Sequence, residues 1–184
     1  VLKIIGVEFQ NNVEVLKENA YLSFQQNKID LAETYVARVL QINPSDLDFV
    51  LFRAKILIEK KDYIHAAALL DVYGRQDSNS KEYLLLRAKV QYDWSKNLSA
   101  AISTIEQALN LYPIDEDILL FAAKLCSEGN VLINNKSVEY FANTILNNNP
   151  KNEKALQSAV EGVIQKKQWQ KAYELSSQLV SKKN

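Results

Sequence analysis

A short segment recurs along this chain at a nearly fixed spacing. Residues 51–55 return as residues 85–89 and, less closely, as residues 120–124. The alanines at the same place in each copy, together with one further upstream, lie 34, 34 and 35 residues apart: Ala20, Ala54, Ala88 and Ala123. A fixed period near 34 residues is typical of a stacked array of supersecondary units, and a chain of 184 residues has room for about five.

Each unit reads as two helices. Apolar residues recur three or four positions apart from residue 13 onward, as on one face of a helix, and short polar breaks divide each unit in its middle. The three prolines, Pro44, Pro113 and Pro150, stand at unit ends, where a helix cannot readily continue. With only 4 glycines and 3 prolines, a fold rich in tight hairpins is disfavoured. The sequence therefore predicts an all-α protein.

The unit boundaries follow from these breaks. We expect residues 1–12 to be an N-terminal appendage or cap and residues 13–184 to form a single repeat domain. At the ends of individual helices, Asp30 is the expected N-cap of the second helix of unit one, and Gly74 the expected C-cap of the second helix of unit two. The predicted units are approximately 13–46, 47–79, 80–114, 115–151 and 152–184.

Three segments make the pattern specific. Residues 62–66 read Asp-Tyr-Ile-His-Ala, and residues 39–44 and 108–113 close their units with an apolar run and a proline. A large residue also recurs three positions before an alanine, at Ile29/Ala32, Tyr63/Ala66, Leu98/Ala101 and Trp169/Ala172. The alanine lets two helices approach closely, and the large residue fills the space beside it.

These features resemble the tetratricopeptide repeat family, over about residues 13–184. The resemblance implies a right-handed superhelical stack of antiparallel helix pairs, whose first helices line a concave groove that binds peptides or helices. The chain departs from the family pattern at Arg53 and Arg87, which stand at usually apolar positions, and at Val138, which replaces the alanine of a second helix. The asparagines of the clamp that some members use for a terminal carboxylate are replaced by Tyr21 and Lys55.

Residue types for catalysis or cofactor binding are scarce. The single histidine, His65, reads as a helix-surface residue, and the single cysteine, Cys126, as a small core residue. No phosphate-binding glycine motif occurs, so we expect no enzyme activity, no cofactor and no metal. With 22 basic and 22 acidic residues the net charge is zero, which disfavours a nucleic-acid partner. No apolar run is long enough to insert in a membrane.

The candidate binding residues lie on one face of the first helix of each unit. The resemblance places on the groove a row of lysines with aromatic and aliphatic neighbours: Lys17, Tyr21, Phe24, Lys55, Ile58, Lys89, Tyr92 and Lys124. Two alternatives stay open. The lysines are either contacts for a partner, or they are simply solvated or paired with acidic residues of the next unit. Leu51, Leu85 and Leu120 belong either to the groove or to the core between helices.

We therefore predict a non-catalytic interaction module that binds a protein or peptide partner, with apolar anchors giving affinity and lysines selecting an acidic segment. The alternative is a structural segment that self-associates into a homo-oligomer or continues a longer array. An RNA-binding repeat is less favoured because no basic stripe is present. The absence of methionine and the start at Val1 indicate a segment of a longer protein.

Overall fold

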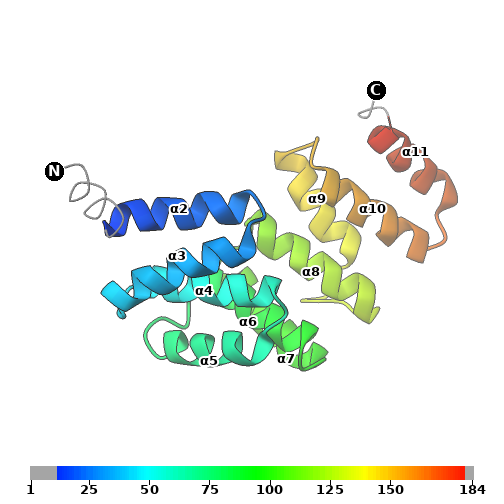
Figure 1. Cartoon of the computed structure of the whole chain (residues 1–184). Helices are drawn as coiled ribbons and strands as arrows, with labels where there is room; N and C mark the ends of the chain where they lie inside the picture. Colours follow the sequence, from blue (N-terminus) through cyan, green and yellow to red (C-terminus); the bar gives the residue numbers. More distant parts are fainter. Residues whose placement is uncertain (1–11, 181–184) are drawn as a thin grey trace. The chain divides into compact units, whose positions relative to one another are not determined.

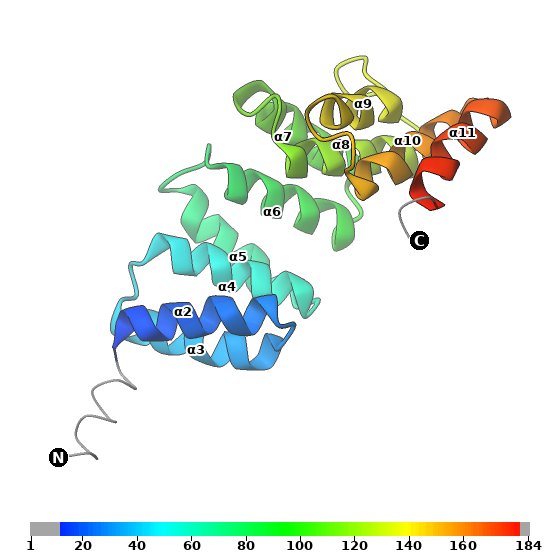
Figure 2. The ribbon, with the colours of Figure 1, turned by 90° about the horizontal axis from the view of Figure 1, so that it is seen from above.

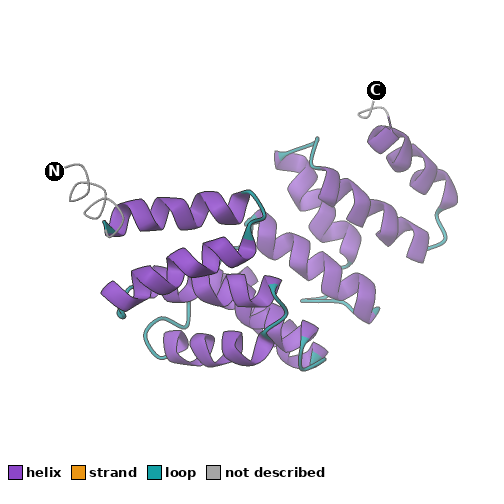
Figure 3. Cartoon of the chain, in the orientation of Figure 1, coloured by secondary structure: helices purple, strands orange, loops and turns teal. Residues whose placement is uncertain are grey.

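The computed structural model describes residues 12–180, which form helices joined by short turns (Figure 3). The one β-type pairing in this range is an isolated bridge between Ile133 and Lys136. Taken in order, the helices form five antiparallel pairs, which confirms the predicted all-α fold. The helices are α2 (Val13–Gln25), α3 (Ile29–Ile42), α4 (Leu47–Glu59), α5 (Tyr63–Gly74), α6 (Lys81–Asp93), α7 (Leu98–Leu111), α8 (Glu116–Gly129), α9 (Val138–Asn148), α10 (Glu153–Gln165) and α11 (Trp169–Val180).

The chain divides into two compact units, Val1–Leu86 and Arg87–Asn184, with the boundary inside α6. In the first unit α2 packs on α3, α3 on α4, and α4 on α5 (Figures 1 and 2). The first three of these helices share one core, because each turns an apolar stripe toward its neighbours. Its buried members are Leu16, Ala20, Ala32, Val36, Val39, Phe49, Phe52 and Ile56.

In the second unit, α7 to α11 pack in chain order, and α10 also contacts α8. The connection between α8 and α9 is longer than the other turns within pairs, and it is anchored by Ile133, which is fully buried. The largest fully buried side chains of this unit are Ile105, Ile118, Leu119, Leu125, Ile133 and Phe141.

The repeating alanines are contact points between helices. Ala20, Ala54, Ala88 and Ala123 are all 0% exposed, as are the alanines of the second helices, Ala32, Ala66 and Ala101. A methyl side chain at these positions lets the neighbouring backbone come close without leaving a void. The 34-residue period therefore marks the packing positions of the array.

Three helices begin directly after an aspartate that caps them. Asp46, Asp62 and Asp115 accept a backbone N–H from the third residue of the helix that follows, which satisfies one of its free donors. The expectation for Asp30 was wrong. Helix α3 already begins at Ile29, without a side-chain cap, so Asp30 lies in its first turn.

The expectation for Gly74 was also wrong. It is the last residue of α5, and the residue after it, Arg75, keeps right-handed backbone angles. A Cβ added at Gly74 would lie 2.5 Å from the hydroxyl oxygen of Tyr83. The glycine therefore makes room for the Tyr83 ring, which stacks on Tyr73 at a centroid distance of 5.7 Å. It does not supply a left-handed turn.

The left-handed residue in the turn inside each pair is instead a lysine or an asparagine. Asn27, Lys61, Lys96 and Lys167 have φ between 52° and 61°. After Lys61, the N–H of Asp62 donates to the carbonyl of Leu57 at 2.8 Å, which closes the end of α4. The same bond recurs after Asn27 and Lys167. Polar side chains project into solvent at these turns, so the strained backbone stays exposed.

Candidate partner-binding groove

A pocket of about 510 Å³ lies in the first unit, on the face formed by the first helices of successive pairs. Residues from α2 and α4 line most of it, and one residue from the first turn of α6 closes it. Three of the predicted groove residues meet here, because α2 and α4 lie side by side with α3 behind them. The lining residues are Tyr21, Phe24, Gln25, Asp48, Leu51, Phe52, Lys55 and Glu82.

Aromatic rings form the floor of this groove pocket. The rings of Tyr21 and Phe52 have centroids 4.7 Å apart, and those of Phe24 and Phe52 are 5.3 Å apart and edge to face. Phe49 extends the cluster below Tyr21, at 5.4 Å. Tyr21 is 40% exposed, so the cluster offers an apolar surface to solvent at its edge. Such a site fits an apolar side chain of a partner.

Opposite charges border the pocket. The ammonium of Lys55 donates a hydrogen bond to Glu82 Oε1 at 2.9 Å, and both side chains are 38% exposed. The same ammonium lies 5.9 Å from the centroid of the Phe24 ring. Burial, followed by the nearby carboxylates of Asp48 and Asp46, raises the pKa of Tyr21, so its hydroxyl keeps its proton at neutral pH. Lys55 is accessible, but it already has an anionic partner.

Lys17 is engaged in holding α2 to α4. Its ammonium lies 2.9 Å from Asp46 Oδ2 and 5.4 Å from the centroid of the Phe49 ring. The hydrogen bond with Asp46 raises the pKa of Lys17. Because Asp46 also caps α4 through the N–H of Phe49, Lys17 contributes to a structural junction.

The predicted residues of the second unit form a separate group. Lys124 lies 3.5 Å from Asp93 Oδ1 and 5.3 Å from the centroid of the Tyr92 ring. The hydroxyl of Tyr92 donates to Glu128 Oε2 at 2.5 Å, and this bond is the main reason that the pKa of Tyr92 rises to about 12. Lys89 is half-buried and makes no ion pair with any residue that the structure describes.

The aliphatic residues are mainly core. Ile58 is 8% exposed, so it offers little surface to a partner. Leu51 and Leu85 are also buried, whereas Leu120 is half-buried; only Leu51 reaches the groove pocket. Four further residues line the groove pocket but were not predicted as site residues: Gln25, Asp48, Phe52 and Glu82. The sequence shows an acidic residue at the second position of several first helices. The structure is needed to show that one of them, Glu82, pairs with Lys55, 27 residues earlier.

Other chemistry is sparse in the described range. His65 is exposed and its Nδ1 lies 2.8 Å from Asp62 Oδ2. Cys126 is buried, and burial raises the pKa of its thiol to about 11, so it is a poor nucleophile at neutral pH. Among residues 12–180 no group of histidine, cysteine and acidic side chains is arranged to hold a metal ion. In the same range, each helix is too short or too polar to cross a membrane.

The fold and the groove define an α-helical repeat protein built from antiparallel helix pairs. Residues 11–90 match the family model described as tetratricopeptide repeat. The remaining pairs continue the same architecture, which solved tetratricopeptide structures share. Residues 11–90 are therefore a tetratricopeptide repeat segment. Such repeats generally serve as protein–protein interaction modules.

Solved structures share this fold at low sequence identity. A MamA structure from Desulfovibrio magneticus RS-1 is 14% identical, with a TM-score of 0.69 over 92% of this chain and 93% of that chain. YrrB, described as a tetratricopeptide repeat protein with an unusual peptide-binding site, is 14% identical, with a TM-score of 0.62 over 98% and 90%. A Thermobaculum terrenum O-GlcNAc transferase mutant is 18% identical, with a TM-score of 0.62 over 73% and 25%. A comparison with curated protein sequences finds no match.

Proposed function

We propose that this chain is a non-catalytic interaction module that binds a segment of a partner protein in the groove pocket between α2 and α4. The observation that carries the proposal is the aromatic floor formed by Tyr21, Phe24 and Phe52 beneath an accessible volume of about 510 Å³. A pocket of this size holds one large apolar side chain, and buried apolar contacts supply most of the affinity at protein interfaces.

Charge sets the kind of segment that fits. An acidic residue beside the apolar anchor competes with Glu82 for the ammonium of Lys55. Because the existing pair is half-exposed, exchanging one carboxylate for another changes the free energy by only about 0–1 kcal/mol. Lys55 therefore contributes mainly to the association rate and to the choice of partner, and the aromatic floor to affinity.

The test begins with peptide selection. A displayed library of random peptides is selected on the wild-type protein, and the affinity of enriched peptides is measured by fluorescence anisotropy. We expect peptides with one aromatic or large aliphatic residue flanked by acidic residues. Gln25→Trp fills the groove pocket from an exposed position and should weaken binding at least about tenfold, as expected when a buried anchor is lost.

The neighbouring Gln26 gives a matched control. It is exposed, of the same residue type, and does not line the groove pocket. Gln26→Trp should leave binding unchanged. Selected peptides that bind Gln25→Trp as tightly as wild type would show that another surface holds the partner.

A second candidate function is self-association through α11. Trp169 and Tyr173 are 64% and 72% exposed and lie four residues apart, so they share one face of this helix. In the first unit the corresponding face of α3 is covered by α4. Sedimentation velocity distinguishes the two functions: self-association requires a dimer or larger species that the double variant Trp169→Glu, Tyr173→Glu reduces to monomer.

A further inference from the structure

A second pocket lies in the first unit, between α3, α4 and α5. It has a volume of about 330 Å³ and contains the side chain of Arg53. Leu57, Ala68 and Leu69 form an apolar wall, and polar groups from α3 and from the turn before α5 border it. Its full lining is Glu33, Arg53, Leu57, Asp62, His65, Ala68 and Leu69.

Arg53 stands at a position that holds a buried alanine in two of the other first helices. It is the seventh residue of α4, and the seventh residues of α8 and α10 are Ala122 and Ala159, both fully buried. The seventh residue is the half-buried Asn19 in α2 and Arg87 in α6, and Arg87 does have an interaction partner. Because a buried alanine fits this position in α8 and α10, packing alone does not require a guanidinium there.

The Nε–H of Arg53 has no acceptor in the described part of the chain. Arg53 Nε is buried without a hydrogen bond. A buried donor left unpaired costs about 1–3 kcal/mol of stability. Positions that break local packing rules at such a cost are expected at functional sites.

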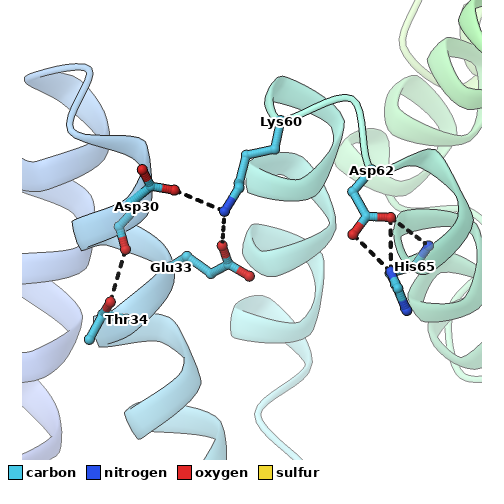
Figure 4. Close-up of polar contacts among 6 residues, drawn as sticks. All are labelled: Asp30, Glu33, Thr34, Lys60, Asp62 and His65. Atoms are coloured by element: carbon cyan, nitrogen blue, oxygen red, sulfur yellow. Dashed lines mark hydrogen bonds and ion pairs between the residues drawn. The ribbon is translucent and has the colours of Figure 1, made fainter.

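The two carboxylates that border the pocket are already engaged (Figure 4). Lys60 bridges Glu33 Oε2 at 2.6 Å and Asp30 Oδ1 at 2.9 Å, and this bridge raises the pKa of Lys60, which stays cationic. Asp62 pairs with His65 Nδ1, and that hydrogen bond lowers the pKa of Asp62. Neither acid forms an ion pair with Arg53, so the guanidinium has no ion-pair partner within the described residues.

We propose that this Arg53 pocket is a second binding site, which takes a carboxylate group of a partner protein. The guanidinium binds the carboxylate through its planar array of donors, and the stem of the incoming group packs on Leu57 and Leu69. The volume suits one side chain or one chain terminus, and is too small for a helix.

This site is distinct from the groove pocket. Arg53 lies two residues from both Leu51 and Lys55, which corresponds to roughly 200° around the axis of α4. The two pockets therefore use opposite sides of one helix, and a partner can occupy one without the other. The second site stands whether or not the groove pocket binds a peptide.

The Nε–H proton of Arg53 gives a direct readout in a nitrogen-15 nuclear magnetic resonance spectrum of the whole chain. Its resonance is assigned by its disappearance in Arg53→Lys. Three blocked peptides are titrated: acetyl-Gly-Glu-Gly-amide carries only a side-chain carboxylate, acetyl-Gly-Gly-Leu only a terminal carboxylate, and acetyl-Gly-Gln-Gly-amide neither. We expect saturable shifts of the Arg53 resonance with a carboxylate peptide and none with the glutamine peptide; the responding peptide identifies the source.

The variants separate binding from folding. Arg53→Met should weaken carboxylate binding at least about tenfold, as expected for the loss of a charge-assisted hydrogen bond. Its urea midpoint should equal or exceed that of wild type, because a buried unpaired donor is removed. Arg75→Met, at an exposed arginine after α5, and Gln25→Trp should leave binding unchanged. The proposal is overturned if neither carboxylate peptide shifts the Arg53 resonance, or if the glutamine peptide shifts it equally.

Discussion

Ala54 tests the packing of the repeat at the level of one residue. Its methyl group is completely buried in α4, where a larger side chain would push neighbouring helices apart. Ala54→Leu should lower the free energy of unfolding by about 1–3 kcal/mol through overpacking. Urea denaturation followed by circular dichroism measures this loss. Ala37→Leu, at an exposed alanine of α3, is the control and should change stability little. Equal midpoints for the two variants would remove Ala54 from the core.

Glu139 predicts a pH dependence of stability. This acid on α9 accepts a hydrogen bond from Lys166 at 2.7 Å and another from Lys171 on α11. These bonds lower the pKa of Glu139 in the folded protein. A lowered pKa means that the stabilising contribution is present above the unfolded value of about 4.3 and is lost as pH falls through the folded value.

Glu139→Gln should therefore be less stable than wild type at pH 7, and the gap should shrink as pH falls below about 4.3. Urea unfolding of both proteins between pH 7 and pH 3 provides the comparison. Glu18→Gln, at an exposed acid of α2 with no ion pair among residues 12–180, should show no such gap. A gap of constant size across this range would mean that Glu139 contributes through shape instead of charge.

Single residues also show what sequence could and could not predict. The buried alanines were predictable, because a packing contact repeats with the array and leaves a period in the sequence. The lysines were predictable as positions on one helix face, and pairing with an acid of the next unit was one of the open alternatives, which holds for Lys55 but not for Lys124. Lys55 pairs with Glu82 of a later helix, whereas Lys124 pairs with Asp93 of an earlier one. A long side chain with several rotatable bonds reaches either neighbour, and spacing alone does not choose between them.

At the scale of helices, α9 and α10 approach each other closely at a glycine of α10. The expectation that Val138 replaces the alanine of a second helix was wrong: Val138 is the first residue of α9, whereas Ala32 and Ala66 are the fourth residues of their helices. Gly162 of α10 faces Val138. A Cβ added at Gly162 would lie 3.3 Å from Val138 Cβ and 3.2 Å from the backbone nitrogen of Glu139. The two helices can approach closely here because Gly162 has no side chain to meet Val138.

Gly162→Leu should destabilise the protein by about 1–3 kcal/mol, since the added side chain meets Val138 and the α9 backbone. Adding Val138→Ala should recover part of this loss, because it restores space on the facing helix. Thermal unfolding of the two single variants and the double variant measures the coupling. Strictly additive effects would contradict direct packing of these two residues.

Helix ends were less predictable than helix positions. Asp46 and Asp115 cap their helices, but Asp30 lies inside the first turn of α3, because Ile29 already belongs to the helix. Gly74 was expected to end its helix with a left-handed turn, but its missing side chain instead makes room for the ring of Tyr83. Local propensity does not include a contact from a helix later in the chain, so both errors arise from tertiary packing.

At the scale of the molecule, a repeat array should lose its last pair without complete unfolding. Helix α11 packs on α10, and α10 packs on α8 and α9, while the core shared by α2, α3 and α4 is independent of both. Deleting residues 151–184 should leave a helical protein with a lower urea midpoint, because stability is roughly a sum over neighbouring contacts. Loss of all helical circular dichroism on this deletion would indicate a single closed bundle.

The repeat period predicted the number of helix pairs but not the division into Val1–Leu86 and Arg87–Asn184. Because the same period runs through all the repeats, it does not indicate where the chain divides into two compact units. The groove pocket was predictable in part for the same reason. Tyr21, Phe24 and Lys55 lie on the helix face that the repeat defines. Gln25 lines the pocket because it is the last residue of α2, and Glu82 because it lies in the first turn of α6.

The central claim is that a partner segment occupies the groove pocket between α2 and α4. Its most direct test is chemical-shift mapping of the nitrogen-15-labelled chain with a peptide selected on the wild-type protein. We predict that the largest changes fall on the amides of Tyr21, Phe24, Phe52 and Lys55, with smaller changes on α3 and α5. Largest changes on α11, or on residues that line the Arg53 pocket, would contradict the claim.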